Sequence, residues 1–408
     1  MEETTNNKDL TISFMFPVTS GIMGGVQMLI INLIKYISIE KHRKVRLYDY
    51  SFGLIRQTLV EMKIENYEFI PLDDSKWHIP NKGNEIFILT NGVWLTYPYF
   101  LKNKENVHIL LWDVFYPYWE TLGTLKGIKI PNFKKQKAMD LLSKNNGVVF
   151  MEKNGFESFH KLGYPVNEKM IVPIPVNCDH NLYAEKHTFD NETLRLGYIG
   201  RSTEWKIYPL KKLVEDLIKT EIKVKVFIYT DNNLKYANYL PVNSNIEYIY
   251  KIGYYEKKLE DSILENNIDI GYAMGTSALE FGRIGVPTIL ADFSNNEFPF
   301  DYKYRFLFDS DVGDLGKDIR DINDKEKRYR LKEIINNIDL PEFSSKTFEY
   351  TKENHSIERV FNKLNYAIDQ NNLRLEFLNL YPFCLSKLRY IVRRTIKQND
   401  KFFGWGFK

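Results

Sequence analysis

The sequence predicts an α/β protein with two Rossmann-like domains facing a central cleft and a basic helical tail at the C-terminus. The chain has 408 residues, of which 44% are hydrophobic, so it is too long for one hydrophobic core and long enough for two. Short apolar runs alternate with segments of helical periodicity, which is typical of parallel strands covered by helices on both faces. The alternation restarts after the proline-containing segment 172–179, which indicates a domain boundary near residue 180.

The first half of the chain opens with a strand, a glycine loop and a helix. Residues 11–17 are β-rich and end in Pro17, the following loop contains Gly24 and Gly25, and residues 26–37 carry apolar side chains at helical spacing. Further strands of this half are expected at 44–50, 67–70, 85–90, 106–113 and 146–152, with a helix at 153–162.

The second half repeats this pattern. A strand at 194–201 enters a Gly-Arg turn, and a helix follows at 208–219. Further strands are expected at 223–230, 245–253, 268–274 and 286–292, with a helix at 256–266. A ligand is therefore expected in the cleft between the two halves, at the carboxyl ends of the strands.

Composition excludes several classes of protein. The formal net charge of +3 gives no argument for nucleic-acid binding by the whole chain. The longest apolar stretches, such as 28–34, fall short of the roughly 20 residues that a membrane-spanning helix needs. The N-terminus is polar and acidic, unlike a secretory signal, so we expect a cytoplasmic protein. Cys178 and Cys384 lack paired spacing, which argues against a disulfide framework or structural zinc.

The C-terminal tail is strongly basic. Residues 371–408 contain eight Lys or Arg and two acidic residues, a local balance of +6. On a helix, residues 383–397 place apolar side chains on one face and basic side chains on the other. Such a helix either packs against the body of the protein or docks on anionic lipid, with the aromatic residues of 401–408 as further anchors.

The turn after the first strand of the second half can bind a diphosphate. Gly200 and Arg201 form a strand-to-helix turn, and Lys206 follows five residues after the arginine. Two cations and the exposed N–H groups of a helix N-terminus can neutralise phosphate oxygens. The alternative is that both cations are ordinary solvated turn residues.

A second polar loop follows the strand at 268–274. Gly275, Thr276 and Ser277 offer backbone N–H groups and hydroxyls to phosphate, and Glu280, expected in the first turn of the next helix, can accept hydrogen bonds from ribose hydroxyls. The alternative for Glu280 is a first-turn acid that only favours the helix.

The candidate catalytic base is Asp113. It follows the strand at 107–112, so its carboxylate is expected to point into the cleft, where an acceptor hydroxyl would arrive. Aromatic residues around it, among them Trp112 and Tyr116, are suited to stacking on a sugar. The alternative is a helix-capping aspartate among core aromatics. Asn91 and Trp94, at the end of another strand, form a second candidate acceptor site.

No metal site is expected. The DSD sequence at 309–311 matches a metal-binding DxD motif, but it lies in a polar stretch after the nucleotide motifs, which favours a chance match. The seven histidines show no paired spacing.

These motifs resemble the nucleotide-binding half of two-domain glycosyltransferases of the GT-B fold, particularly those related to glycosyltransferase family 4. The resemblance rests on LGYIGR with Lys206, on GTSALEFGRIGVPTIL and, more loosely, on SGIMGGVQMLIINL, and it extends to about residue 365. It implies that the cations hold the donor diphosphate, the Gly-Thr-Ser loop meets phosphate or sugar, the glutamate binds ribose, and the N-terminal glycines approach the donor. The donor-binding residues so implied are Gly24, Gly25, Arg201, Lys206, Gly275, Thr276, Ser277 and Glu280.

The sequence departs from the family at one position. The family often has two glutamates eight residues apart, and the second corresponds to Glu280. The first falls on Tyr272, so the carboxylate expected near the transferred sugar is absent. The identity of the sugar and the stereochemical outcome are therefore not predicted.

The resemblance implies a domain plan and a function. The plan is an acceptor-binding domain at 1–178, a nucleotide-sugar-binding domain at 179–345, a helix at 346–370 crossing back to the first domain, and the tail at 371–408. The function is hexosyl transfer, without metal or other cofactor, from a nucleotide-diphosphate sugar to a saccharide or lipid-linked acceptor. The setting is bacterial capsule or lipopolysaccharide synthesis, in the cytoplasm or peripherally on the inner face of the membrane. The alternatives are a non-catalytic two-lobed binding protein and an NAD-dependent enzyme, although the sequence lacks GxGxxG.

Overall fold

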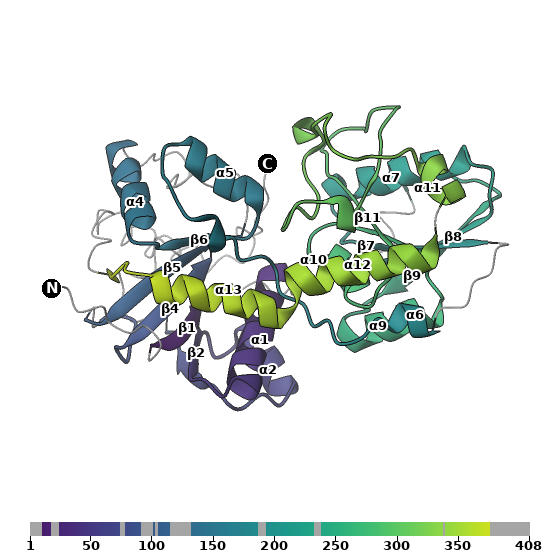
Figure 1. Cartoon of the computed structure of the whole chain (residues 1–408). Helices are drawn as coiled ribbons and strands as arrows, with labels where there is room; N and C mark the ends of the chain where they lie inside the picture. Colours follow the sequence, from purple (N-terminus) through teal and green to yellow (C-terminus); the bar gives the residue numbers. More distant parts are fainter. Residues whose placement is uncertain are drawn as a thin grey trace. The chain divides into compact units, whose positions relative to one another are not determined.

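Both halves of the chain fold as parallel sheets covered by helices, as the sequence predicts (Figure 1). The computed structural model describes residues 10–17, 24–73, 78–90, 101–102, 105–114, 132–186, 193–231, 238–337 and 339–375. The chain divides into two units: unit 1 comprises Met1–Pro173 and Phe361–Lys408, and unit 2 comprises Ile174–Val360.

The sheet of unit 1 has six strands in the order β3-β2-β1-β4-β5-β6, and every described pair is parallel. This is the order of doubly wound Rossmann sheets. Its strands are β1 (Thr11–Met15), β2 (Val45–Asp49), β3 (Glu68–Pro71), β4 (Glu85–Thr90), β5 (Val107–Asp113) and β6 (Val148–Phe150).

Helices cover both faces of this sheet. They are α1 (Gly25–Lys35), which continues into a π-helical turn (Tyr36–Glu40), α2 (Leu54–Glu61), α4 (Asn132–Lys144), α5 (Lys153–Lys161) and most of α13 (Ile357–Gln370). In Figure 1, α1 and α2 lie on the opposite side of the sheet from α4 and α5. Successive side chains of a strand point to opposite faces, so a sheet covered on both faces needs apolar residues at nearly every position.

The segment after α13 belongs to the core of unit 1. The amide of Asn371 donates to the carbonyl oxygen of Ile109 at 2.9 Å, and the N–H of Ile109 donates to the carbonyl oxygen of Leu373 at 2.9 Å. Both Asn371 and Leu373 are fully buried. Residues 371–375 therefore lie along β5 and are not part of a free tail, whereas residues 376–408, including the predicted amphipathic helix, lie outside the described residues.

The sheet of unit 2 has the order β12-β11-β10-β7-β8-β9. Its strands are β7 (Leu194–Ile199), β8 (Val224–Thr230), β9 (Ile246–Ile252), β10 (Ile270–Ala273), β11 (Thr288–Leu290) and β12 (Arg305–Phe306). Five are parallel, and β12 pairs with β11 in the antiparallel direction. The sequence did not predict β12, because two residues carry too little periodicity.

Two helical layers enclose this sheet. The helices of unit 2 are α6 (Leu182–Lys186), α7 (Glu204–Ile218), α9 (Glu256–Glu265), α10 (Thr276–Gly282), α11 (Leu331–Asn337) and α12 (Leu340–His355). Alternate strand residues divide between two core clusters: Tyr198 and Tyr272 pack with α7, whereas Tyr229 and Ala273 pack with α9 and α10.

Two element boundaries differ from the expectation. Helix α7 begins at Glu204 and contains Pro209 in its second turn, where the sequence had indicated a start near residue 208, so Lys206 stands inside the helix. In place of one helix at 346–370, α12 ends at His355 and α13 starts at Ile357. The break at Ser356 has ψ 139°. Across the described residues, no helix is long and apolar enough to cross a membrane.

Candidate functional site

The carboxyl ends of β7 and β10 bring the two predicted donor loops together. These strands are parallel neighbours, with Ile199 opposite Ala273, so the turn at Gly200 and the loop at Gly275 leave the same edge of the sheet side by side. From β7 the strands β8 and β9 are added towards one edge of the sheet, and from β10 the strands β11 and β12 are added towards the other. The strand order therefore reverses between β7 and β10. Open α/β sheets bind ligands at such a switch point.

The turn after β7 is held by a carboxylate from the next strand. Oδ1 of Asp231, which follows β8, accepts the backbone N–H of Ser202 at 2.8 Å and its hydroxyl at 2.9 Å. Partial burial would raise the pKa of Asp231, but the bonds from Ser202 hold it below the usual value. The preceding Arg201 is exposed. Asp231 is not among the residues predicted from the sequence, although its place directly after a strand indicated this role.

Lys206 is a buried cation in the first turn of α7. It is 9% exposed, and its ammonium group lies 5.1 Å from the centre of the Trp205 ring. Burial and, to a smaller extent, the charge of Arg201 lower its pKa to about 8, against the opposing effect of Asp231. No carboxylate of the described residues forms an ion pair with this ammonium group. A desolvated cation without a carboxylate partner is stabilised by a bound anion.

The loop after β10 depends on a glycine. Gly275 has φ 60° and ψ −139°, a conformation that residues with a side chain rarely adopt. Its N–H donates to the carbonyl oxygen of Leu315 at 2.7 Å. The prediction that this N–H binds phosphate is therefore wrong. The backbone N–H groups of Thr276 and Ser277, in the first turn of α10, have no hydrogen bond to a described residue and can serve an anion.

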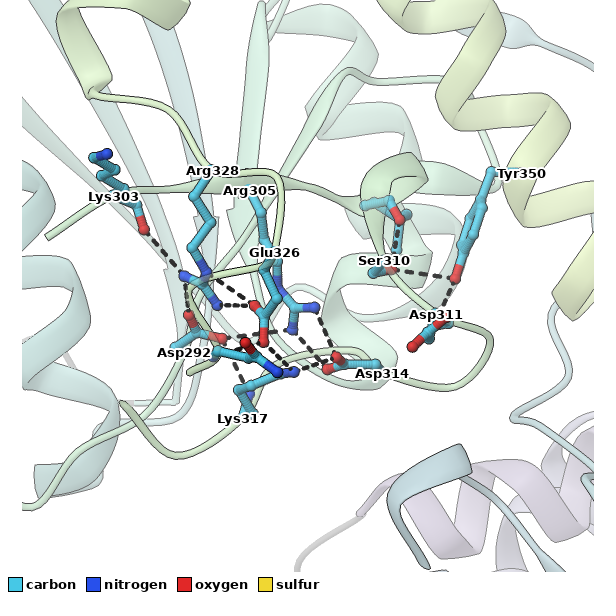
Figure 2. A network of polar contacts seen from close by, with 12 residues as sticks. Asp292, Lys303, Arg305, Ser310, Asp311, Asp314, Lys317, Glu326, Arg328 and Tyr350 are labelled. Atoms are coloured by element: carbon cyan, nitrogen blue, oxygen red, sulfur yellow. Dashed lines mark hydrogen bonds and ion pairs between the residues drawn. The ribbon is translucent and has the colours of Figure 1, made fainter. Parts of the chain in front are cut away.

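A buried ion network fixes the segment that contains Leu315 (Figure 2). The two terminal nitrogens of Arg305 donate to the two oxygens of Asp314 at 2.7 and 2.6 Å, and Lys317 adds an ion pair to Asp314 at 2.9 Å. Burial would raise the pKa of Asp314, but these cations hold it below the usual value. Asp314, directly before Leu315, and Lys317, two residues after it, are thus anchored close to the turn at Gly275.

The network continues behind Asp314. Arg328 donates to the fully buried Asp292 at 2.7 Å and to Glu326 at 2.9 Å, and Lys317 pairs with Glu326 at 2.8 Å. Figure 2 shows the guanidinium groups of Arg305 and Arg328 among these three carboxylates. Each carboxylate thereby has a cationic partner, as buried charges require.

Glu280 stands in the second turn of α10, not in the first. It follows Thr276 by four residues, which places the two side chains on one face of the helix. Nε of Arg283 donates to Oε2 of Glu280 at 2.8 Å. The glutamate is therefore already engaged by a residue that the sequence analysis did not single out, although the spacing of three residues indicated the pair.

Tyr272, at the position of the absent glutamate, belongs to the core. It is fully buried and its hydroxyl donates to the carbonyl oxygen of Pro209 at 3.4 Å. Burial raises its pKa far above the ordinary value. Its side chain packs with α7 and does not line the donor loops.

In unit 1, the predicted residues are described only in part. Gly24 is the N-cap of α1 and Gly25 its first residue. A Cβ at Gly24 would lie 2.8 Å from the side-chain oxygen of Gln27, the end of a flexible side chain that can move aside. Asn91, Trp94 and Tyr116 lie outside the described residues.

Asp113 and Trp112 are both buried at the end of β5. Asp113 is 5% exposed, and a Cβ on Gly155 would lie 3.0 Å from its Oδ2, so the carboxylate lies against the first turn of α5. An anion at that place favours the helix. The indole N–H of Trp112 donates to the carbonyl oxygen of Val172 at 3.0 Å and the residue is 1% exposed. These positions favour the core alternative for Trp112 and place the Asp113 carboxylate against the first turn of α5.

The DSD segment carries protein partners of its own. Asp309 accepts bonds from Lys327 at 3.1 Å and from Tyr329 at 3.2 Å. In the described ranges, no group of three or more His, Cys, Asp or Glu residues is arranged to hold a metal ion.

Known proteins resemble the chain in fold and not in sequence. No protein-family model matches it, and no curated protein is similar to it in sequence. The structure of Alr3699 (HepE) of Anabaena in complex with UDP has a TM-score of 0.54 at 11% identity, covering 88% of this chain and 99% of its own. The apo form of the lipopolysaccharide outer core galactosyltransferase WaaB also has a TM-score of 0.54 at 11% identity, with coverages of 88% and 99%.

A glycosyltransferase from Rickettsia africae has a TM-score of 0.56 at 16% identity and covers 91% of this chain and 99% of its own. The similarity extends over nearly the full length of each of these structures. The chain therefore has the two-domain fold of GT-B glycosyltransferases.

Proposed function

We propose that the protein is a glycosyltransferase that moves a hexose from a nucleotide-diphosphate sugar to a hydroxyl of a saccharide or lipid-linked acceptor. The observation that carries this proposal is Lys206, a buried cation without a carboxylate partner in the described structure, at the switch point of a Rossmann-like sheet. Such a cation is suited to a phosphate group. The adjoining N–H groups of Thr276 and Ser277 add donors from the neighbouring loop.

In this proposal, the cations act on the leaving group. Positive charge at Arg201 and Lys206 stabilises the diphosphate as it departs, because these groups lie where its negative charge develops. The N–H groups at the start of α10 contribute to the same effect. We propose no metal ion for this step.

The donor is proposed to be a UDP-sugar, because a structure of similar fold, HepE, contains UDP. The test is a thermal-shift screen with UDP, GDP, ADP, CMP and NAD. A nucleotide present at 100 times its dissociation constant adds about 2.7 kcal/mol to the free energy of unfolding. Stabilisation by NAD alone would contradict the proposal and favour a dehydrogenase.

Catalysis is tested separately from binding. With the stabilising nucleotide supplied as its sugar conjugate, a transferase releases the nucleoside diphosphate slowly to water and faster when a suitable acceptor is added. A binding protein holds the same conjugate without turnover. Asp113 is the proposed base, with helix stabilisation as its alternative role.

The acceptor pathway and the membrane are a further part of the proposal. We place the enzyme in bacterial surface polysaccharide synthesis, such as capsule or lipopolysaccharide, docked on the inner face of the membrane through residues 383–408. The galactosyltransferase activity of WaaB, which shares the fold, supports this setting. Full-length protein is expected to co-sediment with anionic vesicles at low salt and to be released at high salt.

The matching truncated chain should end at residue 382. A cut after Gln370 would remove Asn371 and Leu373, both fully buried in unit 1. Unfolding and loss of membrane docking could then not be distinguished. If the chain ending at 382 sediments as fully as the intact protein, the tail has no membrane role.

A further inference from the structure

Arg283 links two carboxylates from different helices. It is the C-cap of α10, and its Nε donates to Glu280 on the same helix at 2.8 Å. One of its terminal nitrogens donates to Oε2 of Glu260 on α9 at 2.6 Å. Glu260 also forms an ion pair with Lys257. Glu260 thus holds the guanidinium group of Arg283 through a terminal nitrogen, while Nε bonds Glu280.

The arrangement leaves one oxygen of Glu280 available. Arg283 occupies Oε2, and no described residue bonds Oε1. The side chain of Glu280 is 32% exposed, whereas those of Arg283 and Glu260 are 16% and 10% exposed. The buried contact between Glu260 and Arg283 is therefore fixed. Glu280, which is more exposed, has one carboxylate oxygen available to a ligand.

A glutamate without such a partner would rotate freely. Its side chain has several rotatable bonds, and ordering it on ligand binding costs conformational entropy. A charge-assisted bond from a rigid, anchored guanidinium fork removes that cost before the ligand arrives. Thr276, Glu280 and Arg283 follow at spacings of four and three, so they share the helix face that begins at the candidate phosphate-binding turn.

We infer that Arg283 is a positioning residue that orients Glu280 for the ribose hydroxyls of the donor and thereby helps the site select ribonucleotides over deoxyribonucleotides. The inference rests on the proposed function. The role of Arg283 is indirect: it acts through Glu280, while Glu260 holds it in place.

The experiment compares UDP with 2′-deoxy-UDP by isothermal titration. For Arg283→Gln, UDP affinity is expected to fall about 10-fold or more, as for a lost bond to a charged group, while 2′-deoxy-UDP changes less. The preference for UDP should shrink towards that of Glu280→Ala. Arg283→Lys keeps the charge without the fork, and is expected to restore only part of the preference.

A double-mutant cycle separates positioning from general damage. If Arg283 acts through Glu280, the double variant Arg283→Gln/Glu280→Ala binds UDP no more weakly than Glu280→Ala alone. Arg320→Gln is the matched control, because Arg320 is 81% exposed and pairs with Asp318 outside the donor loops. It is expected to bind both nucleotides as the wild type does.

The outcomes are distinguishable. If Glu280→Ala lowers the preference for UDP while both Arg283 variants keep that of the wild type, or if the two losses add in the double variant, the inference is wrong and the donor site stands. If the wild type binds none of the nucleotides, or if Glu280→Ala binds UDP normally, the proposed donor site fails, and the inference fails with it.

Discussion

The two units bury charged networks at opposite ends of their strands. In unit 1, Glu85, the first residue of β4, is fully buried. It accepts bonds from the hydroxyls of Ser13 at 2.6 Å and Tyr48 at 2.9 Å and pairs with Arg46 at 3.2 Å. In unit 2, the network of Asp292, Asp314 and their cations follows the carboxyl end of β11.

The difference in place gives the two networks different consequences. Ligands of Rossmann-like sheets bind at the carboxyl edge, so the Glu85 network can affect stability but is remote from a ligand of its sheet. The network of unit 2 stands at that edge and fixes Asp314 and Lys317 on either side of Leu315, which holds Gly275. Disrupting the ion network of unit 2 is therefore expected to lower both stability and nucleotide affinity. Disrupting the Glu85 network of unit 1 is expected to lower stability alone.

The most disruptive test of this comparison is Arg305→Met. Removing Arg305 leaves the buried Asp314 with Lys317 as its remaining ion-pair partner among the described residues, and the free energy of unfolding is expected to fall by about 3–5 kcal/mol. Since the Leu315 segment loses one of its two anchors and keeps only Lys317, nucleotide affinity should fall as well. Urea denaturation and titration calorimetry measure the two effects. A variant that loses stability but binds nucleotide as before would show that the network does not brace the donor loop.

Asp113→Asn sharpens the comparison from the side of unit 1. If the carboxylate is the base, turnover should fall by at least about 10²-fold, equivalent to about 2.7 kcal/mol, with donor affinity unchanged. Steady-state kinetics and nucleotide titration provide the two values. A normal rate together with a lower melting temperature would identify Asp113 as the residue that stabilises α5.

Glu85→Gln is the counterpart of the Arg305 variant. It keeps the shape of the side chain but removes the charge that Arg46 and the hydroxyls pair with, which should cost about 2 kcal/mol of stability. Nucleotide affinity is expected to match that of the wild type under conditions where the variant is folded. Weaker nucleotide binding would contradict the separation of roles between the two networks.

The smallest predicted effect is a pH dependence at Lys206. Burial lowers its pKa to about 8, so the folded protein binds fewer protons than the unfolded chain above that pH, and stability without ligand should rise between pH 8 and 10. Nucleotide binding favours the protonated amine, so affinity should fall about 10-fold from pH 7 to 9. Lys206→Met should remove this dependence. Equal slopes for both proteins would assign the titration to another group.

The sheet was predictable from the sequence because its strands are buried on both faces. The expected strands at 106–113 and 223–230 contain the continuous apolar runs 109–112 and 226–229, and the structure has β5 and β8 there. Helix α7 begins earlier than expected. Proline is typical of the first turn of a helix, which favoured a start near residue 208, but Pro209 lies in the second turn.

The candidate site was predictable as a set of loops and not as a set of contacts. The Gly-Thr-Ser pattern indicated a polar loop after the strand, and the structure has a turn there, at which Gly275 has φ 60°. That its N–H is taken by Leu315, and that Arg305 braces this segment, depends on residues dozens of positions away, whose pairing no local pattern encodes. Trp112 shows the same limit: an aromatic ring suited to a sugar is equally suited to a core, and only the position of Val172 separates the two.

The return of residues 371–375 to β5 has a consequence for biosynthesis. Unit 2 is one continuous stretch of chain, Ile174–Val360, and all its core partners have been synthesised once that stretch is translated. Unit 1 contains an early part of the chain and a late one. The N–H of Ile109 can bond the carbonyl oxygen of Leu373 only after that residue is translated, more than 200 residues later. Synthesis proceeds at roughly 5–20 residues per second. The unit that is synthesised first is therefore completed last, and during the interval its incomplete edge is exposed to chaperones and to other nascent chains.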